Sequence, residues 1–280
     1  MSTSRIITRK KIALNNSQTK MVISGWGEES FNNSTVEKIT YLSDGLKVKG
    51  FIAYPNNQTK KYPCVIWNRG GAGNRGAIDE FTARGIFGQL ASWGYVVFAS
   101  QYRGNAGGEG KDELGGSDVK DILNLIPLAN EFDCADNSKW GIEGWSRGGM
   151  MTYITLTKQN KFKCAILVGA ISNAGQNSDE NSVMQKAYEG YFKPENIEEK
   201  LNERSAINFY KKLPPVPYLI MHGGTDDIIS PNQSLEMANK FREMDYQYRL
   251  VIFENGDHYL KTHRKEVDAL RKLWYGKYLK

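Results

Sequence analysis

Short apolar runs alternate with helical patterns along most of this 280-residue chain. Apolar runs suited to strands buried on both faces fall at residues 64–67, 95–99, 140–143, 164–168, 218–221 and 249–253. Helical patterns fill the intervals, at residues 78–93, 117–130, 147–157, 231–244 and 263–278. Strands that alternate with helices need right-handed crossovers and therefore predict a mostly parallel sheet. Catalytic groups gather at the carboxyl ends of such strands.

An antiparallel hairpin is expected before these units. Residues 35–41 and 47–54 alternate between apolar and polar side chains, and Ser43-Asp44-Gly45 supplies the turn. The prediction is an α/β-hydrolase fold with an eight-stranded, mostly parallel sheet and helices on both faces. One catalytic domain would span residues 35–280, after an N-terminal extension of residues 1–34.

The interval 172–217 is longer than one crossover needs. Helices are expected near residues 182–191 and 195–209. They form either a small cap over the strand ends or an ordinary pair of surface helices.

Composition excludes several classes of protein. Hydrophobic residues at 40% and charged residues at 24% are typical of a globular protein. The net charge of +6 is spread along the chain, so a solvated basic surface is expected and a nucleic-acid partner is not. The N-terminus holds no apolar segment suited to a signal peptide or membrane span, which predicts a cytoplasmic protein without membrane contact. The three cysteines are odd in number, and reduced thiols are expected.

Gly144-Trp145-Ser146-Arg147-Gly148 lies between an apolar run and a helical pattern. A serine at a strand-to-helix turn is held exposed as a nucleophile. Glycines two residues to either side prevent collisions between the strained turn, the neighbouring strand and the helix. Ser146 is therefore the expected catalytic nucleophile.

The serine needs a base to take its proton, and the chain has three histidines. His258 follows the last predicted strand, so its loop can reach over the strand ends toward Ser146. His222 lies in a tight glycine turn and is expected to pack and hydrogen-bond locally. His263 is expected to be a solvated helix residue.

The carboxylate that orients the base should lie in another loop at the same edge. Asp226 and Asp227 follow the predicted strand at 218–221, and the chain order Ser, Asp, His suits this type of site. Asp226 is preferred because it is nearer the strand end, whereas Asp227 is expected to brace its loop. Asp257 is a weaker candidate because side chains adjacent in sequence to His258 diverge from it.

The oxyanion of an acyl-transfer intermediate needs hydrogen-bond donors. One would be the backbone N–H of Arg147, and the second that of Gly71 in the glycine-rich loop 68–73. The alternative, a loop that cradles phosphate, lacks both the Walker lysine and the G-x-G-x-x-G spacing. No metal or organic cofactor is needed.

The chain resembles the α/β-hydrolase superfamily and, more closely, the catalytic domain of the prolyl oligopeptidase family. The resemblance runs from about Ile39 to the C-terminus and rests on Ile39-Thr40-Tyr41, Ser43-Asp44-Gly45, Tyr102-Arg103-Gly104, Gly115-Gly116-Ser117-Asp118-Val119, Gly144-Trp145-Ser146, Glu203-Arg204-Ser205 and His222-Gly223-Gly224-Thr225-Asp226-Asp227. It implies Ser146 as nucleophile, Asp226 and His258 as its partners, and a backbone oxyanion hole. The first aspartate of the Asp-Asp pair is the family's triad member.

Three departures from the family pattern affect what the chain is expected to bind. The residues before the hairpin cannot form the β-propeller that screens substrates in the family's peptidases. Arg69 stands where relatives often have His, and Arg147 where they often have Tyr. Either arginine could favour an acidic substrate, or it could pair locally as a structural brace.

These features predict a serine hydrolase that acts through an acyl-enzyme. The preferred interpretation is a prolyl-oligopeptidase-like peptidase on small peptides or acylated amino acids. A carboxylesterase on small esters is the alternative, and a non-catalytic ligand-binding protein is an alternative from another class. An N-terminal arm without its own core could lie across a neighbouring subunit, which leaves a homo-oligomer open.

Overall fold

The computed structural model describes residues 4–176 and 183–280. By their internal contacts they divide into two compact units. The first unit comprises residues 1–69, 73–112 and 116–141, and the second comprises residues 70–72, 113–115 and 142–280. The described residues hold nine strands, one more than predicted.

The first unit is built on a mixed sheet. Its strands lie in the order β1 (Ile6–Lys11), β2 (Ser34–Ser43), β3 (Leu46–Pro55), β5 (Val96–Ser100) and β4 (Tyr62–Asn68). β2 and β3 form the predicted hairpin, in which Ser43 pairs with Leu46. Asp44 and Gly45 both have positive φ, at 49° and 82°, as a two-residue type I′ turn requires. β4 and β5 run parallel.

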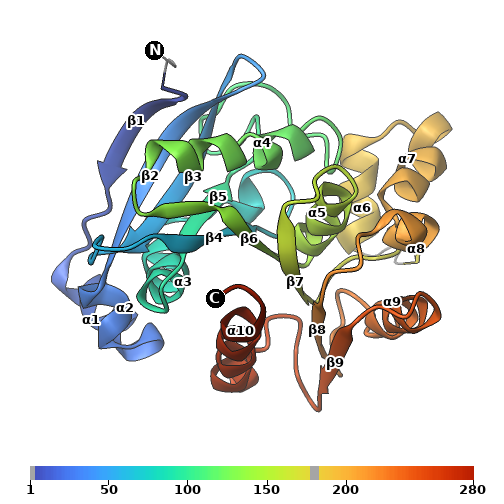
Figure 1. Cartoon of the computed structure of the whole chain (residues 1–280). Helices are drawn as coiled ribbons and strands as arrows, with labels where there is room; N and C mark the ends of the chain where they lie inside the picture. Colours follow the sequence, from blue (N-terminus) through green and yellow to red (C-terminus); the bar gives the residue numbers. More distant parts are fainter. Residues whose placement is uncertain (1–3, 177–182) are drawn as a thin grey trace. The chain divides into compact units, whose positions relative to one another are not determined.

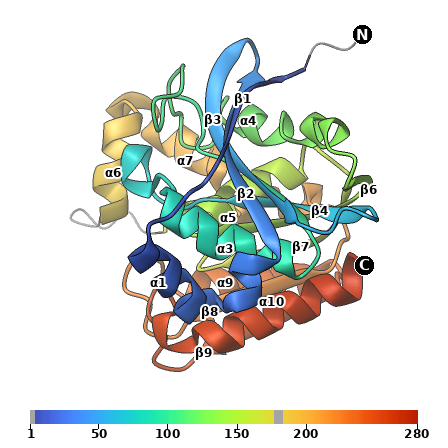
Figure 2. The same cartoon turned by 90° about the vertical axis from the view of Figure 1, so that its left-hand side faces the viewer.

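The N-terminal residues add elements that the sequence pattern did not predict (Figures 1 and 2). β1 pairs antiparallel with β2, and helices α1 (Asn16–Trp26) and α2 (Glu28–Asn32) follow it. α1 and α2 contact α3 (Glu80–Ser92), which covers β2, β3 and β5. A Cβ atom on Gly85 of α3 would lie 2.5 Å from the Trp26 ring, so glycine is needed for this close approach. Residues 4–34 thus pack within the first unit.

The predicted helix at 117–130 is broken in the structure. α4 (Val119–Leu123) has Asn124 as its C-cap, and a 3-10 helix follows at Ile126–Glu131. Pro127 explains the break because it lacks a backbone N–H and disfavours helical geometry in the residue before it.

The second unit begins within β6 (Ala135–Trp145), which runs into it from the first unit, and continues with β7 (Phe162–Val168), β8 (Tyr218–Gly223) and β9 (Tyr248–Phe253) in that spatial order. The β7–β8 and β8–β9 pairs are parallel. α5 (Arg147–Leu156) and α10 (Arg264–Tyr278) contact β7, and α9 (Asn232–Glu243) contacts β8 and β9. Figure 1 shows α10 on one side of these strands and α5 and α9 on the other. The strands and helices therefore agree with the predicted α/β class.

The long interval after β7 holds several short helices. α6 (Val183–Tyr191) matches one predicted helix, of which Ser182 lies outside the described residues. The second predicted helix divides into α7 (Ile197–Arg204) and α8 (Ala206–Phe209) at Ser205, whose backbone is extended. The Ser205 hydroxyl accepts a hydrogen bond from the N–H of Ala174, which ties this break to the loop after β7.

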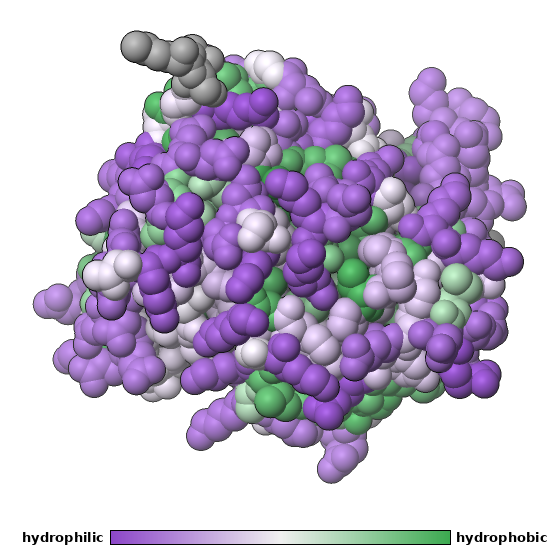
Figure 3. Space-filling model, in the orientation of Figure 1, coloured by the Kyte–Doolittle hydropathy of each residue, from purple (hydrophilic) through white to green (hydrophobic). Residues whose placement is uncertain are grey.

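The surface and core agree with the composition. Figure 3 shows one face of the molecule, on which hydrophilic residues predominate. All three cysteines are buried and free, which confirms the expectation of reduced thiols. Among the described helices, none has both the length and the apolar character needed to cross a membrane. Residues 4–176 and 183–280 contain no group of three or more acidic, histidine or cysteine side chains suited to a metal ion.

Candidate active site

Ser146 occupies the turn between β6 and α5 with a strained backbone. Its φ of 54° and ψ of −123° are unusual for a residue with a side chain. Neighbouring segments hold it in place: its N–H donates to the Val168 carbonyl at 2.9 Å, and its carbonyl accepts from the N–H groups of Gly149 and Ile171. The strain is thus maintained by bonds to the end of β7 and to the first turn of α5.

Glycines allow the close packing around this turn. A Cβ atom on Gly144 would lie 2.0 Å from the Gly148 carbonyl oxygen, a distance that no side chain tolerates. A Cβ atom on Gly149 would lie 2.2 Å from the Cβ of Ala170. Any larger residue at either position would push α5 away from the strands and displace Ser146.

Asp226 and His258 come together at the ends of β8 and β9. The Nδ1 atom of His258 lies 2.7 Å from Oδ2 of Asp226, and both side chains are nearly buried. A carboxylate can only accept here, so Nδ1 carries the proton. The Nε2 atom of His258 is left as the proton acceptor of the ring.

Asp226 is held by several donors. Its Oδ1 accepts from the backbone N–H groups of Ile228 and Ile229, at 2.9 and 2.8 Å. Its Oδ2 lies 3.1 Å from Nε2 of His222 as well as near His258. Burial opposes ionisation, but the hydrogen bonds from both histidines and the Ile229 amide outweigh it and hold the pKa of Asp226 well below its usual value. The carboxylate is therefore charged at neutral pH.

Asp227 and Asp257, the other candidates for the orienting carboxylate, have different surroundings. Asp227 is exposed. The Oδ1 atom of Asp257 accepts from the backbone N–H of Lys261 and thus braces the loop before α10. Among the described residues, Asp226 is the one aspartate whose carboxylate bonds to the His258 ring.

Gly169, directly after β7, lies beside this pair and next to the residue that holds the Ser146 backbone. It has a φ of 50°, and a Cβ atom there would lie 3.5 Å from both Asp226 Oδ2 and the His258 ring. The preceding residue, Val168, accepts the backbone hydrogen bond of Ser146. Within the described part of the chain, the Ser146 hydroxyl forms no hydrogen bond to His258. In enzymes without a bound substrate such bonds are often long and shorten when substrate binds.

The glycine loop after β4 lies beside the same turn. A Cβ atom on Gly70 would lie 3.0 Å from the Trp145 carbonyl oxygen and 3.2 Å from the Ser146 Cβ. Gly71 has a φ of 69°, which favours glycine. Residues 70–72 belong with the second unit for this reason.

The structure favours the brace interpretation for both unusual arginines. Arg147 is 2% exposed, and its Nη1 donates to the Gly71 carbonyl oxygen at 3.1 Å. Arg69 is 1% exposed and donates to the carbonyl oxygens of Gln101 and Gly73. Its guanidinium also stacks on the Tyr102 ring, 4.9 Å from the centroid.

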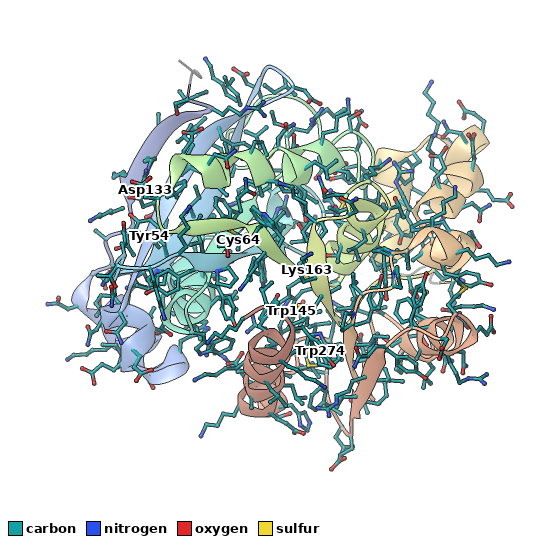
Figure 4. All side chains as sticks on the ribbon, viewed as in Figure 1. Tyr54, Cys64, Asp133, Trp145, Lys163 and Trp274 are labelled. Atoms are coloured by element: carbon teal, nitrogen blue, oxygen red, sulfur yellow. The ribbon has the colours of Figure 1, made fainter. Side chains whose placement is uncertain are left out.

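A buried ionic cluster next to Ser146 was missed from the sequence. Glu143 of β6 accepts from the Trp145 indole, from Nε and Nη2 of Arg271 and from the Tyr275 hydroxyl. Trp145, labelled in Figure 4, thereby links the turn to α10. Glu143 and Arg271 are 128 positions apart, so no local pattern could have paired them.

Comparisons with known proteins find a family model and individual relatives to which the chain is similar. Residues 83–280 match the model of the prolyl oligopeptidase family. The chain is 28% identical over 239 residues to the uncharacterized peptidase YtmA of Bacillus subtilis, covering 83% of this chain and 90% of that protein. It is 25% identical over 273 residues to the uncharacterized peptidase YuxL of the same organism, covering 92% of this chain and 41% of that protein.

Solved structures have the same fold. An acylaminoacyl peptidase in complex with Z-Gly-Gly-Phe-chloromethyl ketone superposes with a TM-score of 0.76 at 22% identity, covering 89% of this chain and 42% of that one. Pyrococcus horikoshii acylaminoacyl peptidase gives 0.75 at 22% identity, covering 90% and 43%. The chain thus spans under half the length of these structures. At this identity the likeness shows the fold alone, and it confirms the predicted α/β-hydrolase architecture.

Proposed function

This chain belongs to the prolyl oligopeptidase family, and from that premise we propose that it is a serine peptidase acting through an acyl-enzyme. Ser146 is the nucleophile, His258 the general base and Asp226 the carboxylate that orients the base. The observation that carries the proposal is the 2.7 Å hydrogen bond between His258 Nδ1 and Asp226 Oδ2. It fixes the tautomer in which Nε2 can take the serine proton.

The reaction follows from these roles. His258 Nε2 removes the hydroxyl proton as Ser146 Oγ attacks the substrate carbonyl carbon, and the carbonyl oxygen becomes an oxyanion. The imidazolium then gives its proton to the departing amine, leaving an acyl-serine. Water attacks this ester with His258 again as base, and Ser146 is regenerated. Asp226 stays ionised throughout and stabilises the imidazolium.

The oxyanion is assigned to backbone N–H groups of Arg147 and Gly71. α5 begins at Arg147, so the amide of this residue lies at the N-terminus of the helix, where backbone N–H groups point outward along the helix axis. Gly70 packs against Ser146, which brings the Gly71 amide into the same region. Donors fixed before the reaction cost no reorganisation when the charge develops.

Short peptides and acylated amino acids are the proposed substrates. A supporting relative is dipeptidyl aminopeptidase A of Saccharomyces cerevisiae, 25% identical over 256 residues, which cover 86% of this chain and 27% of that protein. The buried state of Arg69 and Arg147 does not favour the alternative of an acidic substrate bound by their guanidinium groups.

Two measurements test the proposal. A serine-directed fluorophosphonate should label the wild-type protein and fail to label Ser146→Ala. A panel of aminoacyl-p-nitroanilides, N-acylaminoacyl-p-nitroanilides and p-nitrophenyl esters should give turnover of the anilides that falls by about 10⁴-fold or more in Ser146→Ala. Labelling that survives the substitution would exclude Ser146 as nucleophile. Turnover of esters without any anilide would identify a carboxylesterase instead.

A further inference from the structure

His222 ends β8 in a fully buried position between two elements. Its Nε2 atom lies 2.9 Å from the Ile229 carbonyl oxygen and 3.1 Å from Asp226 Oδ2. Its Nδ1 atom lies 2.6 Å from the Ser234 hydroxyl in α9. The ring therefore connects the proposed triad carboxylate to a helix outside the reacting groups.

These partners decide which nitrogen of His222 carries the proton. The Ile229 carbonyl and the Asp226 carboxylate can only accept, so Nε2 must be protonated. At the other side of the ring, the hydroxyl of Ser234 can donate to Nδ1. Within residues 4–176 and 183–280 this hydroxyl has no acceptor besides Nδ1. His222 is thus assigned the Nε2–H form, in which Nδ1 accepts from Ser234.

We propose that His222 is a positioning residue for catalysis: fixed as the Nε2–H tautomer by Ser234, it shares that N–H between the Ile229 carbonyl oxygen and Asp226 and so helps to set the plane of that carboxylate. The inference rests on the proposed function, since Asp226 and His258 act there as a pair. It goes beyond that function because it assigns a catalytic consequence to a residue that touches neither substrate nor nucleophile.

The physical argument concerns rotation of the carboxylate. Two backbone amides hold Oδ1, and two histidine rings share Oδ2. Without His222, the single side-chain donor on Oδ2 would be His258 itself, whose ring must be held still by Asp226. With His222 in place, the carboxylate is oriented independently of the ring that it orients. The His258 ring is then held in one orientation before substrate arrives.

A purely structural role for His222 would give a different result. In that case the ring would only tie the loop after β8 to α9, through Ile229 and Ser234. Its loss would then lower stability and leave the turnover of the folded protein unchanged. Substitutions at position 222 that keep or lose a donor toward Asp226 therefore separate the catalytic role from the structural one.

Gln and Asn form a matched pair of substitutions at position 222. The Nε2 atom of Gln is as many bonds from Cα as Nε2 of His, so His222→Gln keeps a donor toward Asp226. The amide of Asn reaches only as far as Nδ1, so His222→Asn keeps a polar group near Ser234 and loses the donor to Asp226. We expect kcat on an N-acylaminoacyl-p-nitroanilide to fall about 10- to 100-fold in His222→Asn with KM nearly unchanged. His222→Gln should recover most of kcat.

A spectroscopic measurement tests the tautomer without relying on activity. The chain has three histidines, so its imidazole ¹⁵N signals can be assigned by substituting them one at a time. We expect His222 to show the pattern of a neutral ring protonated at Nε2. In Ser234→Ala that pattern should change, because Nδ1 loses its donor, while the signals of His263 stay in place. kcat in this variant should fall about 3- to 10-fold.

The outcomes separate this inference from the proposed function. If Ser146→Ala abolishes turnover while His222→Asn, His222→Gln and wild type share one kcat, the inference is wrong and the proposed function stands. An Nδ1–H tautomer of His222 would also overturn it. If Ser146→Ala keeps full activity, the proposed function itself fails. Should His222→Asn not fold, Ser234→Ala decides: a wild-type kcat with an altered His222 spectrum would overturn the inference.

Discussion

The Nη1 of Arg147 donates a hydrogen bond to the carbonyl oxygen of Gly71, 3.1 Å away. One residue thereby connects the turn that carries Ser146 to the glycine loop beside it. Arg147 as a whole is 2% exposed, so little of this side chain meets water. The bond fixes the Gly71–Ala72 peptide plane, to which the Gly71 carbonyl belongs, and so restrains the loop that carries the neighbouring Gly71 N–H.

Replacing Arg147 with Met tests this brace. Met keeps much of the buried stem but donates no hydrogen bond, so the loop of residues 70–72 should become mobile. We expect kcat to fall about 10- to 100-fold with a small change in KM, because an oxyanion donor acts chiefly in the transition state. Arg147→Lys, whose ammonium can still donate, should lie between Met and wild type. A loss confined to acidic substrates would instead identify Arg147 as a substrate-binding residue.

Gly144→Ala should severely destabilise the protein. The added methyl would meet the Gly148 carbonyl oxygen at 2.0 Å and the Thr152 hydroxyl at 2.4 Å, and the backbone must move to relieve the clash. We expect a loss of about 3 kcal/mol or more in the free energy of unfolding, measured by urea denaturation. Gly276→Ala is the matched control. Gly276 lies in α10 with open space at its Cβ, so Ala there should stabilise by about 0.5–1 kcal/mol. Equal effects at both positions would contradict the steric argument.

The sequence predicted the strands that are apolar and missed the one that is not. All eight predicted strands are present: six follow apolar runs, although β9 is only partly buried, and the two hairpin strands follow alternating patterns. β1 ends in Thr8-Arg9-Lys10-Lys11, and its side chains are mostly exposed. Its strand conformation depends on hydrogen bonds to β2 rather than on burial. A pattern of hydrophobicity carries no information about such pairing.

The order of residues along the chain was enough to select Ser146, Asp226 and His258 as candidates, because each follows a predicted strand. The contacts that hold these residues were beyond the sequence. His222 was expected to bond locally, and it does bond to Ile229 and Ser234, but its contact with Asp226 depends on the curvature of the loop between them. The partners of Arg147 likewise depend on a loop distant in sequence.

Tyrosine ionisation should limit stability at alkaline pH. Burial, with the charge of Glu37 and a 3.1 Å hydrogen bond to it, raises the pKa of Tyr54 to about 12. An unfolded tyrosine has a pKa of about 10. Between these values the unfolded chain has lost a proton that the folded chain keeps, so stability is full below pH 10 and falls as pH rises toward 12.

Urea denaturation at pH 9, 10 and 11 measures this loss. The contribution of Tyr54 (labelled in Figure 4) should approach a slope of about 1.4 kcal/mol per pH unit, and Tyr54→Phe should remove that part. Burial also raises the pKa values of Tyr41 and Tyr275. The free energy of unfolding of the variant should therefore still fall as pH rises, but less steeply than that of the wild type. An unchanged slope in Tyr54→Phe would show that Tyr54 ionises freely in the folded protein.

The buried pair of Glu143 and Arg271 should stabilise the protein only while both partners are present. Their side chains are 0% and 3% exposed, and Glu143 Oε1 lies 2.8 Å from Arg271 Nε. Although burial opposes the charge of Arg271, Glu143 holds the pKa of Arg271 above its usual value. Glu143→Gln removes the buried anionic partner of this cation, and the carboxylate of Asp268, which also pairs with it, is partly exposed. We expect the free energy of unfolding to fall by about 2–4 kcal/mol.

A double-mutant cycle with Arg271→Met separates the pair from its surroundings. In Glu143→Gln/Arg271→Met no buried charge is left without a partner, so the double variant should lose less stability than the sum of the single losses. We expect a coupling of about 1–3 kcal/mol, measured by urea denaturation of all four proteins. Because Trp145 also donates to Glu143, the turn at Ser146 should loosen in Glu143→Gln, and fluorophosphonate labelling should slow in that variant. Additive losses would show that the two charges are stabilised separately, Arg271 by Asp268 and Glu143 by Trp145 and Tyr275.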